Sequence, residues 1–91
     1  MSGIVSGKLR TAWEAKLRLQ IDRHRSVDPS VNPRKIVELI VRQARERQQT
    51  RLERLLAAEE LSEDEELQIL TLRATIEVVL PELETALKSR C

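Results

Sequence analysis

The sequence predicts an all-α fold of three main helices, in which a helical hairpin forms a dimeric bundle. The chain is rich in leucine, arginine and glutamate and holds only two glycines among its 91 residues, a composition that favours helices. Apolar residues recur at helical spacing in three stretches. Proline pairs and a capping sequence separate those stretches. The only aromatic residue is Trp13, so the predicted core is aliphatic.

The first helix is predicted over residues 8–25, where Leu9, Trp13, Leu17 and Ile21 are spaced four residues apart and share one face. The alternation of Leu17, Leu19 and Ile21 also permits a short strand, as in the ribbon-helix-helix class of DNA-binding proteins. Those proteins place a helix almost directly after the strand, whereas here a loop of eight or more residues follows. The helix is therefore the prediction.

The second helix is predicted over residues 33–60, after the loop sequence SVDPSVNP. Asn32 is a favoured capping residue, and Pro33 suits the first helical position, where its missing N–H costs nothing. The remaining organisation is simple: residues 1–7, with two glycines and two serines, are expected to be a flexible N-terminus. Residues 8–91 are expected to form a single helical domain.

The third helix is predicted over residues 63–80. Ser62 with Glu65 three residues later is the signature of a capping box, and acidic residues fill the first turn, where the helix dipole favours them. Pro81 predicts a kink or the start of a short fourth helix. The short connection between the second and third helices predicts that they fold back as an antiparallel hairpin.

This hairpin places the polar stretch 42–51, which has no large apolar residue, opposite residues of about 73–82, which are rich in valine, isoleucine and leucine. Leaving such side chains in water forgoes roughly 1.5–3 kcal/mol each. The first helix and a second copy of the chain are therefore both expected to cover the third helix. The predicted dimer interface is Ile69, Leu72, Ile76, Val79 and Leu83.

Charge is divided unevenly along the chain. Residues 1–58 carry 13 Lys and Arg against 6 Asp and Glu, whereas residues 59–91 carry 3 against 9. The hairpin predicts ion pairs of Arg47 with Glu77 and of Arg42 with Glu82, and it leaves Arg45, Arg51 and Arg54 without an opposing acid. A basic surface is therefore predicted to bind a partner. Its residues are Arg18, Arg23, Arg25, Arg45, Arg51 and Arg54.

Nothing in the sequence predicts catalysis, a metal or a cofactor. His24 is the single histidine and lies in a charged helix end, and two glycines cannot form a phosphate-binding loop. The acidic cluster of residues 59–66 lacks the glycine and spacing of a calcium loop. It is interpreted as a capped helix start, with a surface for a basic partner or loose metal binding by oxygen ligands as the alternatives. Cys91 has no internal partner, and no stretch approaches the ~20 apolar residues of a membrane span, so a cytoplasmic protein is expected.

These observations predict a non-enzymatic, dimeric regulator or adaptor that binds another macromolecule, expected to be a protein, through its basic surface. The alternative is a small regulator that binds nucleic acid through the arginine-rich helices, because guanidinium groups match phosphate geometry. The sequence holds no zinc finger and no set of aromatic residues for stacking on bases.

Overall fold

The computed structural model describes residues 2–90, and the side chains of residues 7–90. This part of the chain is helical apart from two loops and holds no strand, which confirms the all-α prediction. The first helix begins at Ser2, before the predicted start at Lys8; whether residues 1–7 are flexible stays a prediction. The elements are α1 (Ser2–Val27), α2 (Pro33–Leu56), α3 (Glu63–Ala74), the π-helical segment η1 (Thr75–Val79) and α4 (Leu80–Ser89).

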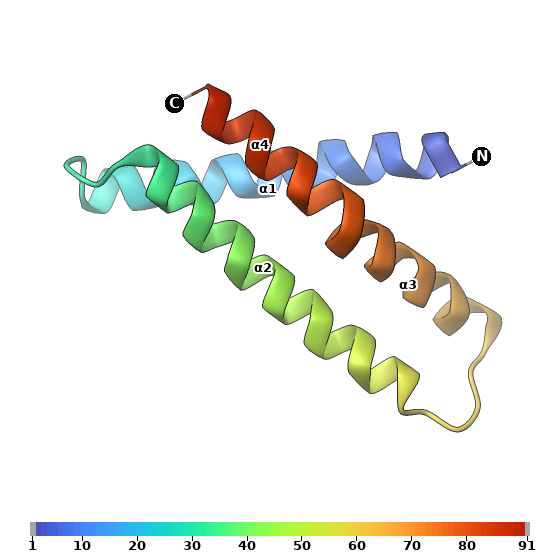
Figure 1. Cartoon of the computed structure of the whole chain (residues 1–91). Coiled ribbons are helices and arrows are strands. Elements are labelled where there is room, and N and C mark those ends of the chain that lie inside the picture. The colour runs from blue at the N-terminus through green and yellow to red at the C-terminus, as the bar shows by residue number, and fades with distance from the viewer. Residues whose placement is uncertain (1, 91) are drawn as a thin grey trace.

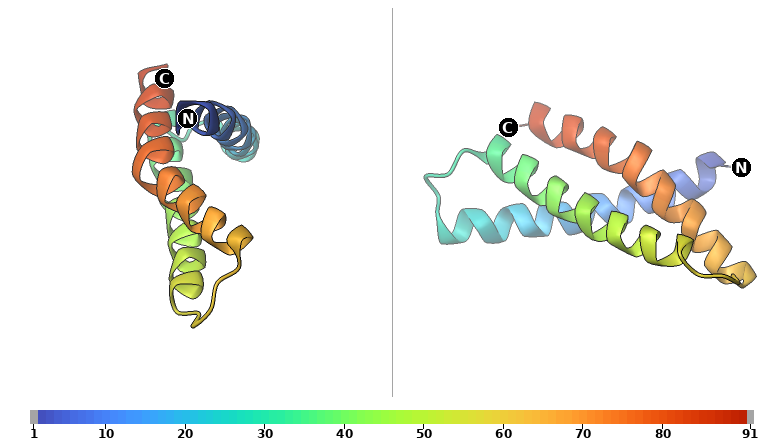
Figure 2. Two further views of the ribbon diagram at one scale, coloured as in Figure 1. Left: turned by 90° about the vertical axis from the view of Figure 1, so that its right-hand side faces the viewer. Right: turned by 60° about the horizontal axis from the view of Figure 1, so that its bottom comes forward.

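Two arms form the hairpin: α2, and the continuous rod of α3, η1 and α4 that runs antiparallel to it (Figure 1). Helix α1 crosses one side of this hairpin at a large angle, as the turned views show (Figure 2). The molecule is elongated, with extents of 48 × 26 × 16 Å. The α1–α2 loop and the α2–α3 loop lie at opposite ends of α2, so the two loops mark the two ends of the hairpin.

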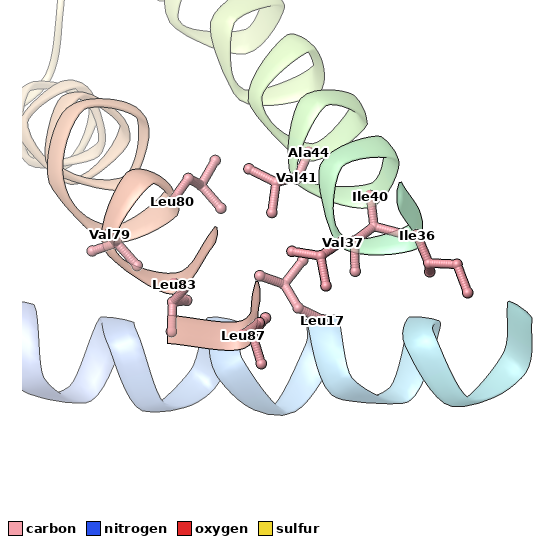
Figure 3. Packing of buried hydrophobic residues seen from close by; sticks show 10 residues of the cluster. All are labelled: Leu17, Ile36, Val37, Ile40, Val41, Ala44, Val79, Leu80, Leu83 and Leu87. Atoms are coloured by element: carbon pink, nitrogen blue, oxygen red, sulfur yellow. The ribbon is translucent and has the colours of Figure 1, made fainter. Parts of the chain in front are cut away.

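The hydrophobic core lies where α1 crosses the hairpin, between the first half of α2 and the rod of η1 and α4 (Figure 3). Leu17 is the only fully buried residue among the described side chains of α1, with Leu9, Trp13 and Ile21 packed partly against the core. The predicted apolar face of the first helix is therefore the one that packs. The remaining core residues are Ile36, Val37, Ile40, Val41 and Ala44 of α2, Val79 of η1, and Leu80, Leu83 and Leu87 of α4.

Helix α2 begins as predicted but ends earlier. The Asn32 side chain accepts a hydrogen bond from the Arg34 N–H at 3.0 Å, and Pro33 occupies the first turn. The helix ends at Leu56, four residues before the predicted end at residue 60. Continuing it would place Glu59 and Glu60 at the negative end of the helix dipole, which is unfavourable. The connection to α3 is consequently longer than predicted.

The predicted capping box is present at the start of α3. The Ser62 hydroxyl accepts from the Glu65 N–H, and the Glu65 carboxylate accepts from the Ser62 N–H, both at 3.2 Å. Together these bonds satisfy two N–H groups that the helix itself cannot.

Replacing Ser62 with alanine is expected to lower the free energy of unfolding by about 0.5–2 kcal/mol, because the Glu65 N–H loses its acceptor. The measurement is the midpoint of chemical unfolding. Ser26→Ala is the matched control, since Ser26 is an exposed serine in the last turn of α1. Equal midpoints for the parent and the Ser62 variant would show that the cap adds nothing to stability.

The predicted irregularity at Pro81 takes the form of a π turn. The Leu80 N–H donates to the Thr75 carbonyl, five residues earlier, instead of to residue 76. Proline lacks an N–H and its ring crowds the carbonyl four residues before it, so a wider turn just ahead of Pro81 accommodates it without ending the rod. The extra residue in this turn also shifts the register of α4 against α2.

Candidate partner-binding surface

The residues predicted to form a dimer interface do not share one free face. Leu72, Val79 and Leu83 are buried within the chain, and Ile69 and Ile76 are partly buried. Their burial by the protomer's own helices leaves Leu72, Val79 and Leu83 little side-chain surface for a second copy. The sequence correctly predicts that the third helix is apolar on several faces. The spacing of apolar residues alone does not show which of those faces α1 and α2 cover.

The predicted basic surface is divided between two sides of the molecule. Arg18 forms an ion pair with Glu14 at 3.2 Å, and Glu14 also lies 3.5 Å from Arg90 at the end of α4. Arg45 lies 4.0 Å from Glu84 of α4. This corrects the expectation that Arg45 has no acid opposite it, because Glu84 lies beyond the residues of about 73–82 that the predicted hairpin set opposite the polar stretch. Arg25 is two helical turns from Arg18 and belongs to the same side of α1.

The other half of the basic surface lies in the crevice between α1 and α2. Arg51 lines it, and Arg54 follows three residues later on the same face. Arg47, four residues before Arg51, also lines this crevice and forms no ion pair with Glu77. Neither predicted pair of the polar stretch is present among the described residues, because Glu82 pairs instead with Arg10, at 3.3 Å.

Arg23 lies near the end of α1, beyond the crevice between α1 and α2. It lies three residues after Gln20, which lines the crevice, and it lines a separate hollow beside the α1–α2 loop. That hollow also contains His24 and Asp28. The six arginines predicted to bind a partner therefore do not form one surface: Arg51 lines the crevice, Arg23 lines a separate hollow, and Arg18 and Arg45 pair with different acids.

A groove beside Trp13 is the main concave feature of the crevice. Two adjoining cavities of about 280 and 180 Å³ meet at Trp13 and Gln48, and we call them together the Trp13 groove. The larger cavity lies between α1, α2 and α3 and is mostly apolar; the smaller lies between α1 and α2. The lining residues are Leu9, Trp13, Lys16, Gln20, Gln43, Ala44, Arg47, Gln48, Arg51, Leu67, Gln68, Thr71, Leu72 and Thr75.

The polar lining of the Trp13 groove is cationic or neutral. The Lys16 ammonium lies 5.1 Å from the centre of the Trp13 ring, a cation–π arrangement, and Arg47 and Arg51 approach from α2. Four glutamine amides provide hydrogen-bond donors and acceptors. No aspartate or glutamate lines either cavity. The groove therefore combines an apolar floor with positive charge, and none of its three cations has an ion-pair partner among the described side chains.

The larger cavity falls just below the ~300–1,000 Å³ typical of small-molecule sites, and its lining has no histidine, cysteine or carboxylate to act as base or nucleophile. Among the residues that the structure describes, no cluster of three or more His, Cys, Asp or Glu is placed to hold a metal ion. Within the same part of the chain, no helix has the length and apolar character needed to cross a membrane.

Ion pairs with perturbed pKa values lie away from the groove, where α4 meets α2. The Lys88 ammonium lies 2.9 Å from both Glu38 and Glu84. The hydrogen bond from Lys88, helped by its charge, lowers the pKa of Glu38, and the hydrogen bonds to Glu38 and Glu84 raise the pKa of Lys88. The stability from Glu38 is present above its unfolded pKa and is lost as pH falls through its lowered folded value. That from Lys88 is lost as pH rises through its raised folded value.

Replacing Lys88 with methionine is therefore expected to raise the pKa of Glu38 toward the ordinary glutamate value, because the donor and its positive charge are both removed. The change is measured by following the Glu38 carboxyl carbon in an NMR pH titration. The matched control is Arg90→Met, which removes a cation two residues away that lies beside Glu14 instead of Glu38. A Glu38 pKa that is the same in the parent and Lys88→Met would contradict the ion pair.

Sequence reasoning missed the groove but not all of its parts. The set Trp13, Lys16 and Gln20 has i, i+3, i+7 spacing, which places a cation and an amide beside the only aromatic residue. This spacing could have been recognised in the sequence. The positions of Arg47 and Gln48 in the groove could not, because they depend on how α1 crosses α2. No match to this chain was found in a scan of protein-family models, among the curated proteins or among the solved structures, so the function is argued from this geometry.

Proposed function

We propose that this protein is a non-enzymatic, dimeric regulator or adaptor that binds an acidic segment of another protein in the Trp13 groove. The observation that carries the proposal is the lining: an apolar floor with Trp13, no carboxylate, and three cations that have no ion-pair partner among the side chains of residues 7–90. Such a groove suits a helix or extended segment that inserts one or two apolar side chains and places acidic side chains beside Lys16, Arg47 and Arg51.

Four features favour a protein partner over nucleic acid. The larger cavity has an apolar floor that can hold side-chain anchors, whereas phosphate binding needs charge but no apolar floor. The glutamine amides suit backbone and side-chain groups of a peptide. Only one aromatic residue is available, whereas single strands are held by several stacked bases. The arginines on the two sides of α1 also lack the single continuous track that follows a phosphate backbone.

The proposal is tested by titrating the full chain with three labelled probes. The first is an amphipathic peptide with leucines at helical spacing and glutamates elsewhere; the second is polyglutamate; the third is duplex DNA. Each titration is run at two salt concentrations. We expect the amphipathic peptide to bind most tightly and to keep part of its affinity at the higher salt, since its apolar anchors are not screened.

Two outcomes would overturn the proposal. Equal binding of the peptide and polyglutamate would show that the apolar floor is not used. Tighter binding of DNA, with a log–log salt slope near −0.9 per phosphate neutralised, would establish the nucleic-acid alternative instead. An affinity of the amphipathic peptide that survives added salt, with weak DNA binding, supports a protein partner.

A further inference from the structure

Among the described residues, an apolar stripe along α3 and η1 is left largely uncovered. Leu67, Leu70 and Val78 are 61%, 64% and 45% exposed. Leu67, Leu70 and Ala74 follow the three- and four-residue spacing of one helix face. A π turn advances less per residue than an α turn, so η1 brings Val78, rather than Glu77, into line with them. Three exposed, large apolar side chains and the partly buried Ala74 thus form a single row.

We propose that a second copy of this chain packs antiparallel on this stripe, with Ala74 at the two-fold axis. This proposal specifies the dimer named in the proposed function. It rests on that part of the proposed function and not on binding in the Trp13 groove. The stripe is self-complementary: Leu70 lies four residues before Ala74 and Val78 four residues after it. An antiparallel copy therefore sets Leu70 against the partner's Val78 and Val78 against the partner's Leu70. Such reciprocal contacts are what a closed two-fold interface requires.

The residue at the axis permits a close approach. Alanine projects only a methyl group, so two helices can come to the ~8 Å end of the usual range of interaxial distances. At that separation the leucine and valine side chains on either side of Ala74 reach the opposite helix. A large residue at the same place would hold the helices apart.

Charges beside the stripe favour the same arrangement. Arg73 and Glu77 lie one turn apart on one flank of the stripe, and neither forms an ion pair among the described residues. In an antiparallel pair, like flanks meet. Arg73 then lies opposite the partner's Glu77, and Glu77 opposite the partner's Arg73. A parallel copy would not produce these two pairs. The charges therefore favour a second copy of this chain as the partner, and they favour its antiparallel orientation.

This interface differs from the Trp13 groove in all but one residue. Leu67 lines the groove and also ends the stripe, whereas Leu70, Ala74 and Val78 line neither cavity of the groove. Substitutions at Leu70 or Ala74 therefore separate self-association from binding of the acidic probe.

The test uses disulfide formation and solution mass. With Cys91 replaced by serine, Ala74→Cys is expected to give a covalent dimer rapidly under mild oxidation, because two cysteines on the axis meet the ~4.4–6.8 Å separation of a disulfide. Glu53→Cys, exposed on α2, is the control and is expected to stay monomeric. By light scattering, the parent should have twice the 10.5 kDa chain mass, and Leu70→Glu should have the chain mass with helicity unchanged.

A charge exchange makes the test specific for orientation. Arg73→Glu should shift the dimer toward monomer, and the double change Arg73→Glu with Glu77→Arg should restore it. A parent chain that stays monomeric would overturn the proposal but leave the peptide titration unaffected. A dimer that Leu70→Glu does not weaken would place the interface elsewhere. A Leu70→Glu chain of unchanged mass that no longer binds the acidic peptide would show that the stripe belongs to the other partner.

Discussion

Replacing Leu17 with alanine is expected to lower the free energy of unfolding by about 2–5 kcal/mol, the largest stability effect that we predict for a single change. Leu17 has no exposed surface and is the only fully buried residue among the described side chains of α1. Its side chain enters the core between α2 and α4 (Figure 3). Removing it leaves a cavity and takes away the main anchor of α1 on the hairpin. A domain is stable by only about 5–15 kcal/mol, so this is a large share.

The matched control is Leu19→Ala, two residues away on the same helix. Leu19 is 53% exposed, and truncating it is expected to change stability by no more than about 0.5 kcal/mol. Both values come from chemical unfolding followed by circular dichroism. If the two leucines proved equally important, α1 would not pack on the hairpin by the face described, and the Trp13 groove, which α1 helps to form, would not exist.

Reversing the charge of Arg47 and Arg51 together is expected to weaken binding of the acidic amphipathic peptide by about 100-fold or more. Both arginines line the Trp13 groove without an ion-pair partner, so their removal exposes no buried acid. Two glutamates in their place would face the acidic side chains of the peptide, and like charges juxtaposed at an interface cost several kcal/mol. The affinity is measured by calorimetry, with circular dichroism to check that helicity is kept.

The control for this prediction makes the same change of charge outside the groove. Arg34→Glu with Lys35→Glu, in the first turn of α2, reverses two exposed cations that line neither cavity. That variant should keep most of the affinity at moderate salt, because its charges are screened from the groove. An equal loss in both double variants would mean that binding follows the overall charge of the chain and has no site.

The sequence predicted the helices well because their ends are decided by local chemistry. Asn32 with Pro33, and Ser62 with Glu65, act within one turn of the chain, so no knowledge of the fold is needed to recognise them. The end of α2 was less well predicted, because Ala57 and Ala58 after Leu56 favour helix and the unfavourable position of Glu59 and Glu60 was given too little weight.

The candidate site was harder to predict because it depends on contacts between distant residues. Arg45 and Arg47 are two residues apart and look equivalent in the sequence, yet one lies 4.0 Å from Glu84 and the other faces α1. The predicted pairing set the stretch 42–51 opposite residues of about 73–82, which do not include Glu84. Likewise, the apolar residues of α3 were recognised, but which of them α1 covers is decided by the crossing of α1. The chemistry of each side chain could be predicted from the sequence, but the neighbouring helix that it faces could not.

Trp13 itself offers the most direct measurement, because it is the only aromatic residue in the chain and lies at the junction of the two cavities. Its fluorescence reports this groove without any label. We expect the acidic amphipathic peptide to shift Trp13 emission to shorter wavelength, with the same midpoint as binding measured by calorimetry. The shift should disappear in the variant Arg47→Glu with Arg51→Glu. Peptide binding that leaves Trp13 emission unchanged would contradict binding in the Trp13 groove, because the partner would then lie outside it.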